Sequence, residues 1–397
     1  MRKALREANK NNGKKDTKRK KKSKVSFKKI NLNKKTKIVL IFLVVFVLLV
    51  ILMKNYTTFG LVVNKNITSK DVIQVELKSS NNNIFPYKNN VLVYENGTLL
   101  CYNKHGKLKW ETIIEDTLYA DINVAGDFIQ VINKDKNTIY IFKNRYEISR
   151  IKLKENLSSG SITKDGISLI EYNYLGSKKA IAIYDKYGRQ KYDVKLNNSI
   201  IGKSVLSNDG RYLAYIDVDI SGISTYSKVN IIDLKNIDES DLNYVTAYSE
   251  NNKLVYDIYW YGKKLVIRTE DELKLYNLTN KELISNDITS GSYENIGLEK
   301  LNYAYVSQDE KGTHYLTLSK LLSKNNKSIE IEELPKYFVY TNGLAYICYS
   351  KKIEIYNGFG MKIKNYDSDF VITKPVIFNE GTGVAFIVSN KLILFNI

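Results

Sequence analysis

Two histidines, two cysteines and one segment with alternating aspartates are the residues of this 397-residue chain that could support chemistry. A histidine serves in catalysis when a nucleophile or carboxylate lies within hydrogen-bond reach. Neither His105 nor His314 stands beside a Ser or Cys nucleophile motif, so we interpret both as solvated residues near turns. Cys101 and Cys348 lie almost 250 residues apart, in repeat units that we do not expect to be neighbours. Because a disulfide requires Cα atoms about 6 Å apart, we expect two buried, free thiols.

The acidic segment is a candidate metal site. In Asp217-Val218-Asp219-Ile220-Ser221-Gly222 the oxygen-bearing side chains alternate and a glycine follows, as in the first half of a calcium loop. Asp217, Asp219 and Ser221 would be the ligands. The glutamate that completes such a loop is replaced by Lys228, whose charge would repel the ion. We therefore favour an ordinary turn between two strands, and expect neither a metal nor a cofactor.

A short sequence motif that recurs eight times indicates the fold in which these residues lie. Each copy alternates aliphatic residues, and most copies end on an aromatic or polar residue before a turn; the copies end at Tyr102, Phe142, Tyr184, Asp233, Tyr276, Leu318, Tyr356 and Phe395. The intervals between these ends run from 38 to 49 residues. One four-stranded blade of a propeller needs about 40 to 45 residues. The sequence therefore predicts an all-β chain folded as a β-propeller, with eight four-stranded blades over residues 71–397.

The two ends of this domain are predicted to meet. The last unit stops on its third strand, Lys391 to Asn396, with no fourth strand behind it. Val72 to Leu77 alternates apolar and polar residues ahead of the first full unit. Pairing the two segments would close the ring and remove an exposed sheet edge.

Two turns resemble the tryptophan-docking motif of quinoprotein-type propellers. The first runs from Tyr102 to Glu111 and contains Gly106 and Trp110; the second contains Gly188, with Tyr192 in the tryptophan position, and 356–366 is a looser copy. The resemblance implies that the glycine and the aromatic residue lock neighbouring blades together. It brings no positions for a quinone or for its calcium ion. Ser307 to Tyr315 likewise resembles the Asp-box hairpin of sialidases, which is a structural turn in those enzymes.

The chain ahead of the repeats predicts a membrane anchor. Residues 1–37 hold 17 Lys or Arg and two acidic residues, a composition typical of a disordered tail. Residues 38–53 are uncharged and apolar, and can form a transmembrane helix whose flanking lysines reach the interfaces. No small-residue cleavage site follows Met53, so an uncleaved anchor is favoured over a signal peptide. Residues 54–70 are expected to be a linker.

The flanking charges predict the orientation. Eleven Lys or Arg occur in the 20 residues before the span and three in the 20 after it, which places the tail in the cytoplasm and the repeats outside the membrane. The tail is expected to contact anionic lipid. Nucleic acid is the alternative partner, but Phe27, near the end of the basic run, is its one aromatic residue, so no aromatic platform is interleaved with it.

Tail, anchor and divergent repeats together resemble uncharacterised single-pass propellers of Gram-positive bacteria. From the resemblance and the missing catalytic motifs we predict a non-enzymatic scaffold that binds another protein at the cell envelope, through one rim or the mouth of the central channel. A receptor for a wall glycan or small ligand, drawing on the 31 tyrosines, is one alternative. An extracytoplasmic lyase or hydrolase is a second.

Overall fold

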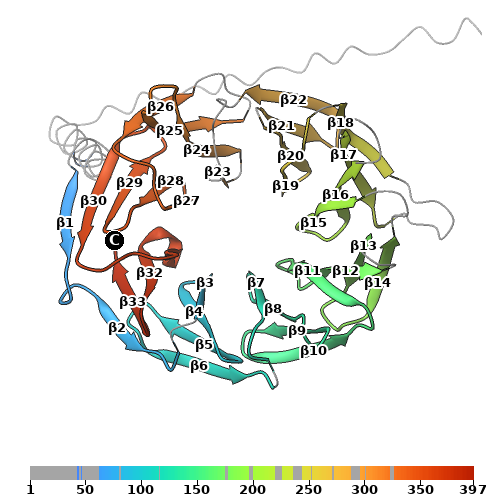
Figure 1. Cartoon of the computed structure of the whole chain (residues 1–397), viewed down its shortest axis with the longest axis horizontal. Coiled ribbons are helices and arrows are strands. Elements are labelled where there is room, and N and C mark those ends of the chain that lie inside the picture. Colours follow the sequence, from blue (N-terminus) through green and yellow to red (C-terminus); the bar gives the residue numbers. More distant parts are fainter. Residues whose placement is uncertain are drawn as a thin grey trace, which may run out of the picture. The chain divides into compact units, whose positions relative to one another are not determined.

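The strands form eight sheets arranged as blades around a central axis, as the sequence predicts (Figure 1). The computed structural model describes Leu43, Phe46 and residues 62–397, apart from 80–81, 116, 175–177, 196–199, 220–225, 236–243, 252, 271, 288–295, 300 and 322–325. Seven sheets have four strands and one has five. The prediction of an all-β, eight-bladed propeller is confirmed.

Blades 1 to 4 follow one another along the chain. Their strands are β3 (Asn83–Tyr87), β4 (Asn90–Glu95), β5 (Thr98–Asn103) and β6 (Leu108–Ile113); β7 (Asp121–Ala125), β8 (Phe128–Asn133), β9 (Thr138–Lys143) and β10 (Tyr146–Lys152); β11 (Asn156–Ile162), β12 (Ser168–Tyr174), β13 (Lys178–Tyr184) and β14 (Gln190–Lys195); and β15 (Ile200–Leu206), β16 (Tyr212–Asp219), β17 (Tyr226–Asp233) and β18 (Tyr244–Asn251).

Blades 5 to 8 complete the ring. Their strands are β19 (Asp257–Tyr261), β20 (Lys264–Arg268), β21 (Glu272–Asn277) and β22 (Glu282–Asp287); β23 (Ile296–Glu299), β24 (Asn302–Gln308), β25 (His314–Lys320) and β26 (Lys327–Ile331); β27 (Tyr337–Thr341), β28 (Leu344–Cys348), β29 (Lys352–Asn357) and β30 (Lys362–Ser368), with β1 (Val63–Ile67); and β31 (Val376–Phe378), β32 (Gly383–Val388) and β33 (Lys391–Asn396), with β2 (Ile73–Glu76). A 3-10 turn, η1 (Asn379–Gly381), joins β31 to β32.

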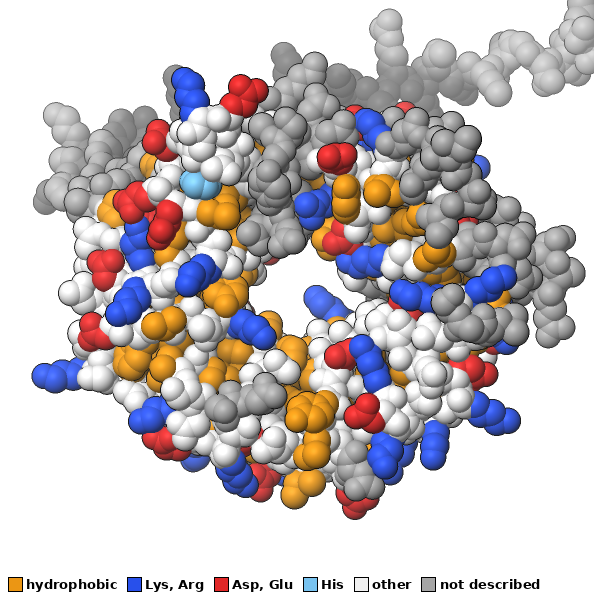
Figure 2. Space-filling view, in the orientation of Figure 1, with side chains coloured by type: hydrophobic (Ala, Val, Ile, Leu, Met, Phe, Trp, Pro, Cys, Tyr) orange, Lys and Arg blue, Asp and Glu red, His pale blue; other side chains and the backbone are white. Residues whose placement is uncertain are grey.

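The recurring sequence motif forms the third strand of every blade. In β9, for example, the first five residues from Thr138 to Phe142 are all buried. A third strand lies between two other strands, and its two faces pack against the adjacent blades, so apolar residues are favoured on both sides. The first strand of each blade lies nearest the axis (Figure 1). Figure 2 shows an opening at the centre of the ring, with Lys and Arg side chains at its edge.

Ring closure by the N-terminal segment is also confirmed. Strand β2 pairs antiparallel with β33, with Ile73 opposite Leu394 and Glu76 opposite Lys391. The Leu77 N–H donates to the Asn390 carbonyl at 2.7 Å. Ile73 and Val75 pack on a cluster of buried residues from blades 1 and 8. The fourth strand of the last blade is therefore the first part of the domain.

The expected linker, residues 54–70, contains a strand. Strand β1 pairs parallel with β30 and makes blade 7 five-stranded. The turn after it is held by Asp71, whose carboxylate accepts bonds from the Thr68 hydroxyl at 2.7 Å and backbone N–H at 3.1 Å, with Lys65 at 3.1 Å. These contacts, led by those from Thr68, lower the pKa of Asp71 to about 2. The propeller thus begins at Val63, before the predicted start at 71. The sequence pattern missed β1 because four of its five residues are exposed.

The predicted tail (1–37) and transmembrane helix (38–53) lie outside the described residues, except for Leu43 and Phe46, which are helical. Within the part of the chain that the structure describes, no helix is long and apolar enough to span a membrane.

Because the strands of each blade are antiparallel, the ring has two faces. We call upper the face with the connections from fourth to first and from second to third strands, such as 114–120 and 134–137. The lower face carries the turns from first to second and from third to fourth strands, such as 104–107 and 186–189.

The closing strand generates a stability prediction. Val75→Asp places a carboxylate in the apolar contact between blades 8 and 1, so it should lower the free energy of unfolding by about 2–4 kcal/mol. Gln74→Asp, at the adjacent exposed position of the same strand, is the matched control and should change it by less than about 0.5 kcal/mol. Thermal unfolding of the full chain measures both. Equal midpoints for the two variants would show that β2 does not hold the ring closed.

Candidate functional site

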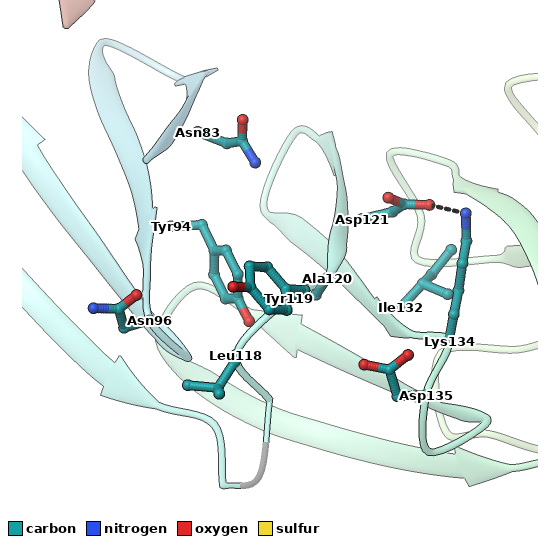
Figure 3. Close-up of a pocket in the computed structure, with 10 residues that line it drawn as sticks. All are labelled: Asn83, Tyr94, Asn96, Leu118, Tyr119, Ala120, Asp121, Ile132, Lys134 and Asp135. Atoms are coloured by element: carbon teal, nitrogen blue, oxygen red, sulfur yellow. Dashed lines mark ion pairs between the residues drawn. The ribbon is translucent and has the colours of Figure 1, made fainter. Parts of the chain in front are cut away.

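A cleft of about 310 Å³ opens on the upper face between blades 1 and 2 (Figure 3). Blade 1 contributes the start of β3 and the end of β4, and blade 2 contributes the start of β7 and the turn after β8. The connection from β6 to β7 crosses between them. The lining residues are Asn83, Tyr94, Asn96, Leu118, Tyr119, Ala120, Asp121, Ile132, Lys134 and Asp135.

Buried hydrogen bonds fix the connection that forms one wall of the cleft. The Tyr94 hydroxyl donates to the Thr117 carbonyl at 2.6 Å, and the Asn133 side-chain amide donates to the Thr117 hydroxyl at 3.1 Å. The Ile114 N–H donates to the Gly97 carbonyl at 2.7 Å. Burial, and then proximity to Tyr140, raises the pKa of Tyr94 to about 12. The phenol therefore stays protonated at neutral pH and keeps donating.

The mouth of the cleft combines apolar and charged groups. Leu118 is 66 % exposed, and Tyr119, the next residue, is 70 % exposed. Two large side chains, one apolar and one aromatic, are thus exposed side by side in the sequence. Asp121 and Lys134 form an ion pair at 2.7 Å on the blade 2 side (Figure 3), and Asp135 lies in the same turn as Lys134. Such a site can bind a ligand through an aromatic ring, a leucine and polar groups at its edge.

The residues of the first docking motif contact both neighbours of blade 1. Gly106 has φ of 71°, and a Cβ atom there would lie 2.5 Å from Ile73 Cγ2 of the closing strand. Trp110 is half-buried and packs on a cluster shared with blade 2. Its ring meets Tyr87 edge-on at 5.9 Å, and the Tyr87 hydroxyl donates to the Asn144 side chain of blade 2 at 2.9 Å.

The second motif repeats this arrangement in blade 3. A Cβ atom on Gly188 would lie 3.2 Å from Ser149 Cβ in β10 of blade 2. Tyr192 packs on the cluster between blades 3 and 4. In the looser copy, a Cβ on Gly360 would lie 2.6 Å from Ile329 of blade 6. In all three turns the glycine lies against the preceding blade.

Of the three candidate calcium ligands, the structure describes Asp217 and Asp219. Asp217 is buried and forms an ion pair with Lys228 at 3.0 Å on the facing strand. The Asn230 amide also donates to Asp217, at 3.4 Å. Asp219 lies further along the same strand, and Ser221 lies outside the described residues. Among the described residues, no group of three or more His, Cys, Asp or Glu side chains could hold a metal ion.

The histidines and cysteines lie apart from one another and from the cleft. His105 is in a lower-face turn of blade 1, whereas His314 begins β25 at the upper face of blade 6. Cys101 and Cys348 are buried and unpaired, as predicted. Burial raises the pKa of the Cys101 thiol to about 11 and that of Cys348 to about 12. Neither thiol is a nucleophile at neutral pH, because the reactive form is the thiolate.

A buried carboxylate between blades 3 and 4 is a feature that the sequence analysis missed. Glu171 in β12 accepts hydrogen bonds from the Ser159 hydroxyl at 2.7 Å and from the Ser204 hydroxyl of β15. Lys179 lies 3.6 Å away. The glutamate therefore joins two blades near the channel. An isolated Glu in an apolar strand gives no signal of this role.

Comparison with protein families finds a match for most of the chain. Residues 63–394 match the model of a family of unknown function, DUF5711. The chain belongs to this family. The match begins at the first residue of β1 and ends within β33, so it covers the closed propeller including the strand that the sequence pattern missed. A comparison with curated proteins found no significant match.

Several solved structures are similar to this DUF5711 chain. They include Kuenenia stuttgartiensis hydrazine synthase (11 % identity, TM-score 0.44, 81 % of this chain and 97 % of that one). The tricorn protease matches at 12 % identity and TM-score 0.49, over 73 % of this chain and 34 % of that one. The β-propeller domain of Myceliophteria thermophila Cps50 (Swd1) matches at 7 % identity and TM-score 0.45, over 82 % and 99 %. No activity is carried over from proteins this distant.

The docking glycine can be tested with a matched pair. Gly106 and Gly262 both have positive φ, but a Cβ on Gly262 meets nothing within 4 Å. Alanine at either position is strained by the backbone conformation, and only Gly106→Ala also collides with β2. We expect Gly106→Ala to be less stable than Gly262→Ala by about 1–3 kcal/mol in urea unfolding. Equal stabilities would refute the docking role.

Proposed function

We propose that this chain is a membrane-anchored, extracytoplasmic and non-catalytic propeller, which serves as a protein-interaction scaffold at the cell envelope. Its partner binds at the cleft between blades 1 and 2. The observation that carries the proposal is the exposed pair Leu118 and Tyr119, held at the mouth of this cleft by buried hydrogen bonds. Large apolar side chains fixed at a cleft are typical of the centre of a protein interface.

The anchor is supported by the sequence ahead of the propeller. Residues 38–53 contain no charged side chain, and basic residues are concentrated on their N-terminal side. Leu43 and Phe46 are helical, with exposed fractions of 61 % and 66 %. Exposed apolar side chains on a helix suit a lipid environment. The 17 basic residues of the tail then face anionic lipid on the cytoplasmic side.

A glycan or small-ligand receptor is the second candidate, and the same cleft supports it. The Tyr119 ring could stack on a sugar, with Asn83, Asn96 and Asp135 supplying hydrogen bonds. A wider glycan-binding surface has less support, because 15 of the described tyrosines are buried, among them the stacked pair Tyr303 and Tyr305. The lyase or hydrolase alternative has less support, because His105 and His314 lie on opposite faces and cannot act on one substrate.

Topology gives the first test of the proposal. A protease added outside intact, wall-less cells should degrade the propeller and spare residues 1–37, because positive charge flanks the cytoplasmic side of the span. Antibodies against each end of the chain report the fragments. A propeller that survives until the cells are lysed would overturn the extracytoplasmic location.

The cleft gives the second test. A photo-crosslinking amino acid at Tyr119 in living cells should yield an adduct with another protein, and the same residue at Tyr256, which is 53 % exposed on the upper face of blade 5, should not. When Leu118→Ala is combined with the crosslinking residue at 119, the yield of adduct should fall about tenfold. This corresponds to the loss of ~1.4 kcal/mol of binding free energy, as expected for a hot-spot residue. Because Leu118 is exposed, the unfolding midpoint should not change.

An adduct at both positions, or at neither, would contradict binding at the cleft. A carbohydrate adduct at Tyr119 would support the receptor alternative and count against the scaffold.

A further inference from the structure

The lower face of the propeller is basic along one arc of its rim. The turns from third to fourth strands in blades 1, 2 and 3 are exposed on this face and carry Lys104, Lys107, Lys143, Arg145, Lys186 and Arg189. The acidic residue among them is Asp185, whose carboxylate accepts the N–H groups of Tyr187 and Arg189 and pairs with the Arg189 side chain at 2.7 Å. Of the six cations, Arg189 is paired with Asp185 and Lys143 lies near Asp127 of the neighbouring turn, so positive charge exceeds negative charge along this rim.

Aromatic side chains stand at the tips of these same turns. Tyr146 and Tyr187 are each 60 % exposed, and Phe359 in the equivalent turn of blade 7 is 68 % exposed. The Arg145 guanidinium lies 4.7 Å from the Tyr146 ring, and the Lys186 ammonium lies 5.1 Å from the Tyr187 ring. A projecting aromatic ring beside a cation is the combination found at membrane interfaces, where the ring sits at headgroup level.

The positions of these tips favour a flat partner. Blades 3 and 7 are four places apart in a ring of eight, so Tyr187 and Phe359 lie on opposite sides of the opening (Figure 1). Both turns are on the lower face. A small ligand or a narrow peptide cannot reach both tips, whereas an extended plane can.

The chain also begins its path through the propeller at this face. Val63 pairs with Lys364, near the start of β30 and just after the lower-face turn that carries Phe359. Nine residues, 54–62, separate Val63 from the end of the proposed span. Fully extended, they reach about 30 Å, which sets an upper limit on the distance between Val63 and the proposed span.

We infer that the lower face of the propeller lies against the outer surface of an anionic bilayer, with its aromatic tips in the interface and its Lys and Arg side chains on lipid phosphates. The inference rests on the proposed anchor. It leaves the upper face, with the cleft, directed away from the membrane. At that cleft Asp121 and Asp135 are balanced by Lys134 and Lys136, so it offers no excess positive charge to anionic lipid.

The test uses the full chain reconstituted in nanodiscs of phosphatidylglycerol and phosphatidylcholine. Variants with one added cysteine, Tyr187→Cys, Phe359→Cys or Tyr119→Cys, carry an environment-sensitive fluorophore at that position, and the native thiols stay unlabelled because both are buried. We expect quenching by brominated lipid at positions 187 and 359, and none at 119. Replacing phosphatidylglycerol by phosphatidylcholine should reduce the quenching at 187.

Charge reversal provides the matched control. Arg145→Glu with Lys186→Glu on the lower face should abolish quenching at 359, and Lys136→Glu with Lys311→Glu, at exposed upper-face turns, should leave it unchanged. If the chain incorporates but the fluorophore is quenched at position 119, or is quenched at neither 187 nor 359, the inference is wrong. The proposed anchor would still stand. A chain that does not incorporate into the nanodisc would overturn the proposed anchor and the inference with it.

Discussion

The pairing of β2 with β33 is the constraint on which the rest of the propeller depends. Each blade contacts only its two neighbours, so an array that lacks one strand would present a free edge and an uncovered blade face. Four residue pairs between the two ends of the domain remove that edge. The strand before it, β1, follows the outer edge of blade 7, where it pairs with β30.

The glycine turns show how each blade packs against the one before it. Gly106 approaches the side chain of Ile73, so the strand that closes blade 8 also forms the surface on which blade 1 docks. The same contact recurs between blades 2 and 3 and between blades 6 and 7. In these turns a side-chain oxygen, that of Asn103, Asp185 or Asn357, accepts two backbone N–H groups. The turn is thereby fixed, and the glycine keeps its place against the preceding blade.

The sequence predicted the features that depend on local pattern. The third strands are apolar on both faces, and the closing strand alternates strictly, so both could be recognised without a structure. Strand β1 could not, because only Ile67 is buried. The cleft could not be predicted either. Its walls come from two blades, and their separation depends on how side chains such as Trp110 pack between them. Leu118 and Tyr119 lie in a connection with no periodic pattern to mark them as exposed.

The antiparallel blade gives the propeller two faces with different loops. The lower-face turns that carry Gly106, Gly188 and Gly360 are short and tied by their own hydrogen bonds, so they are alike in blades 1, 3 and 7. Upper-face connections are less uniform: the one between β10 and β11 spans 153–155, and the one between β30 and β31 spans 369–375. Turns of this kind suit the proposed contact with a bilayer, for which charge and interfacial aromatic residues are sufficient. A selective partner requires a local shape, and among the described residues the connection with Leu118 and Tyr119 provides one on the opposite face.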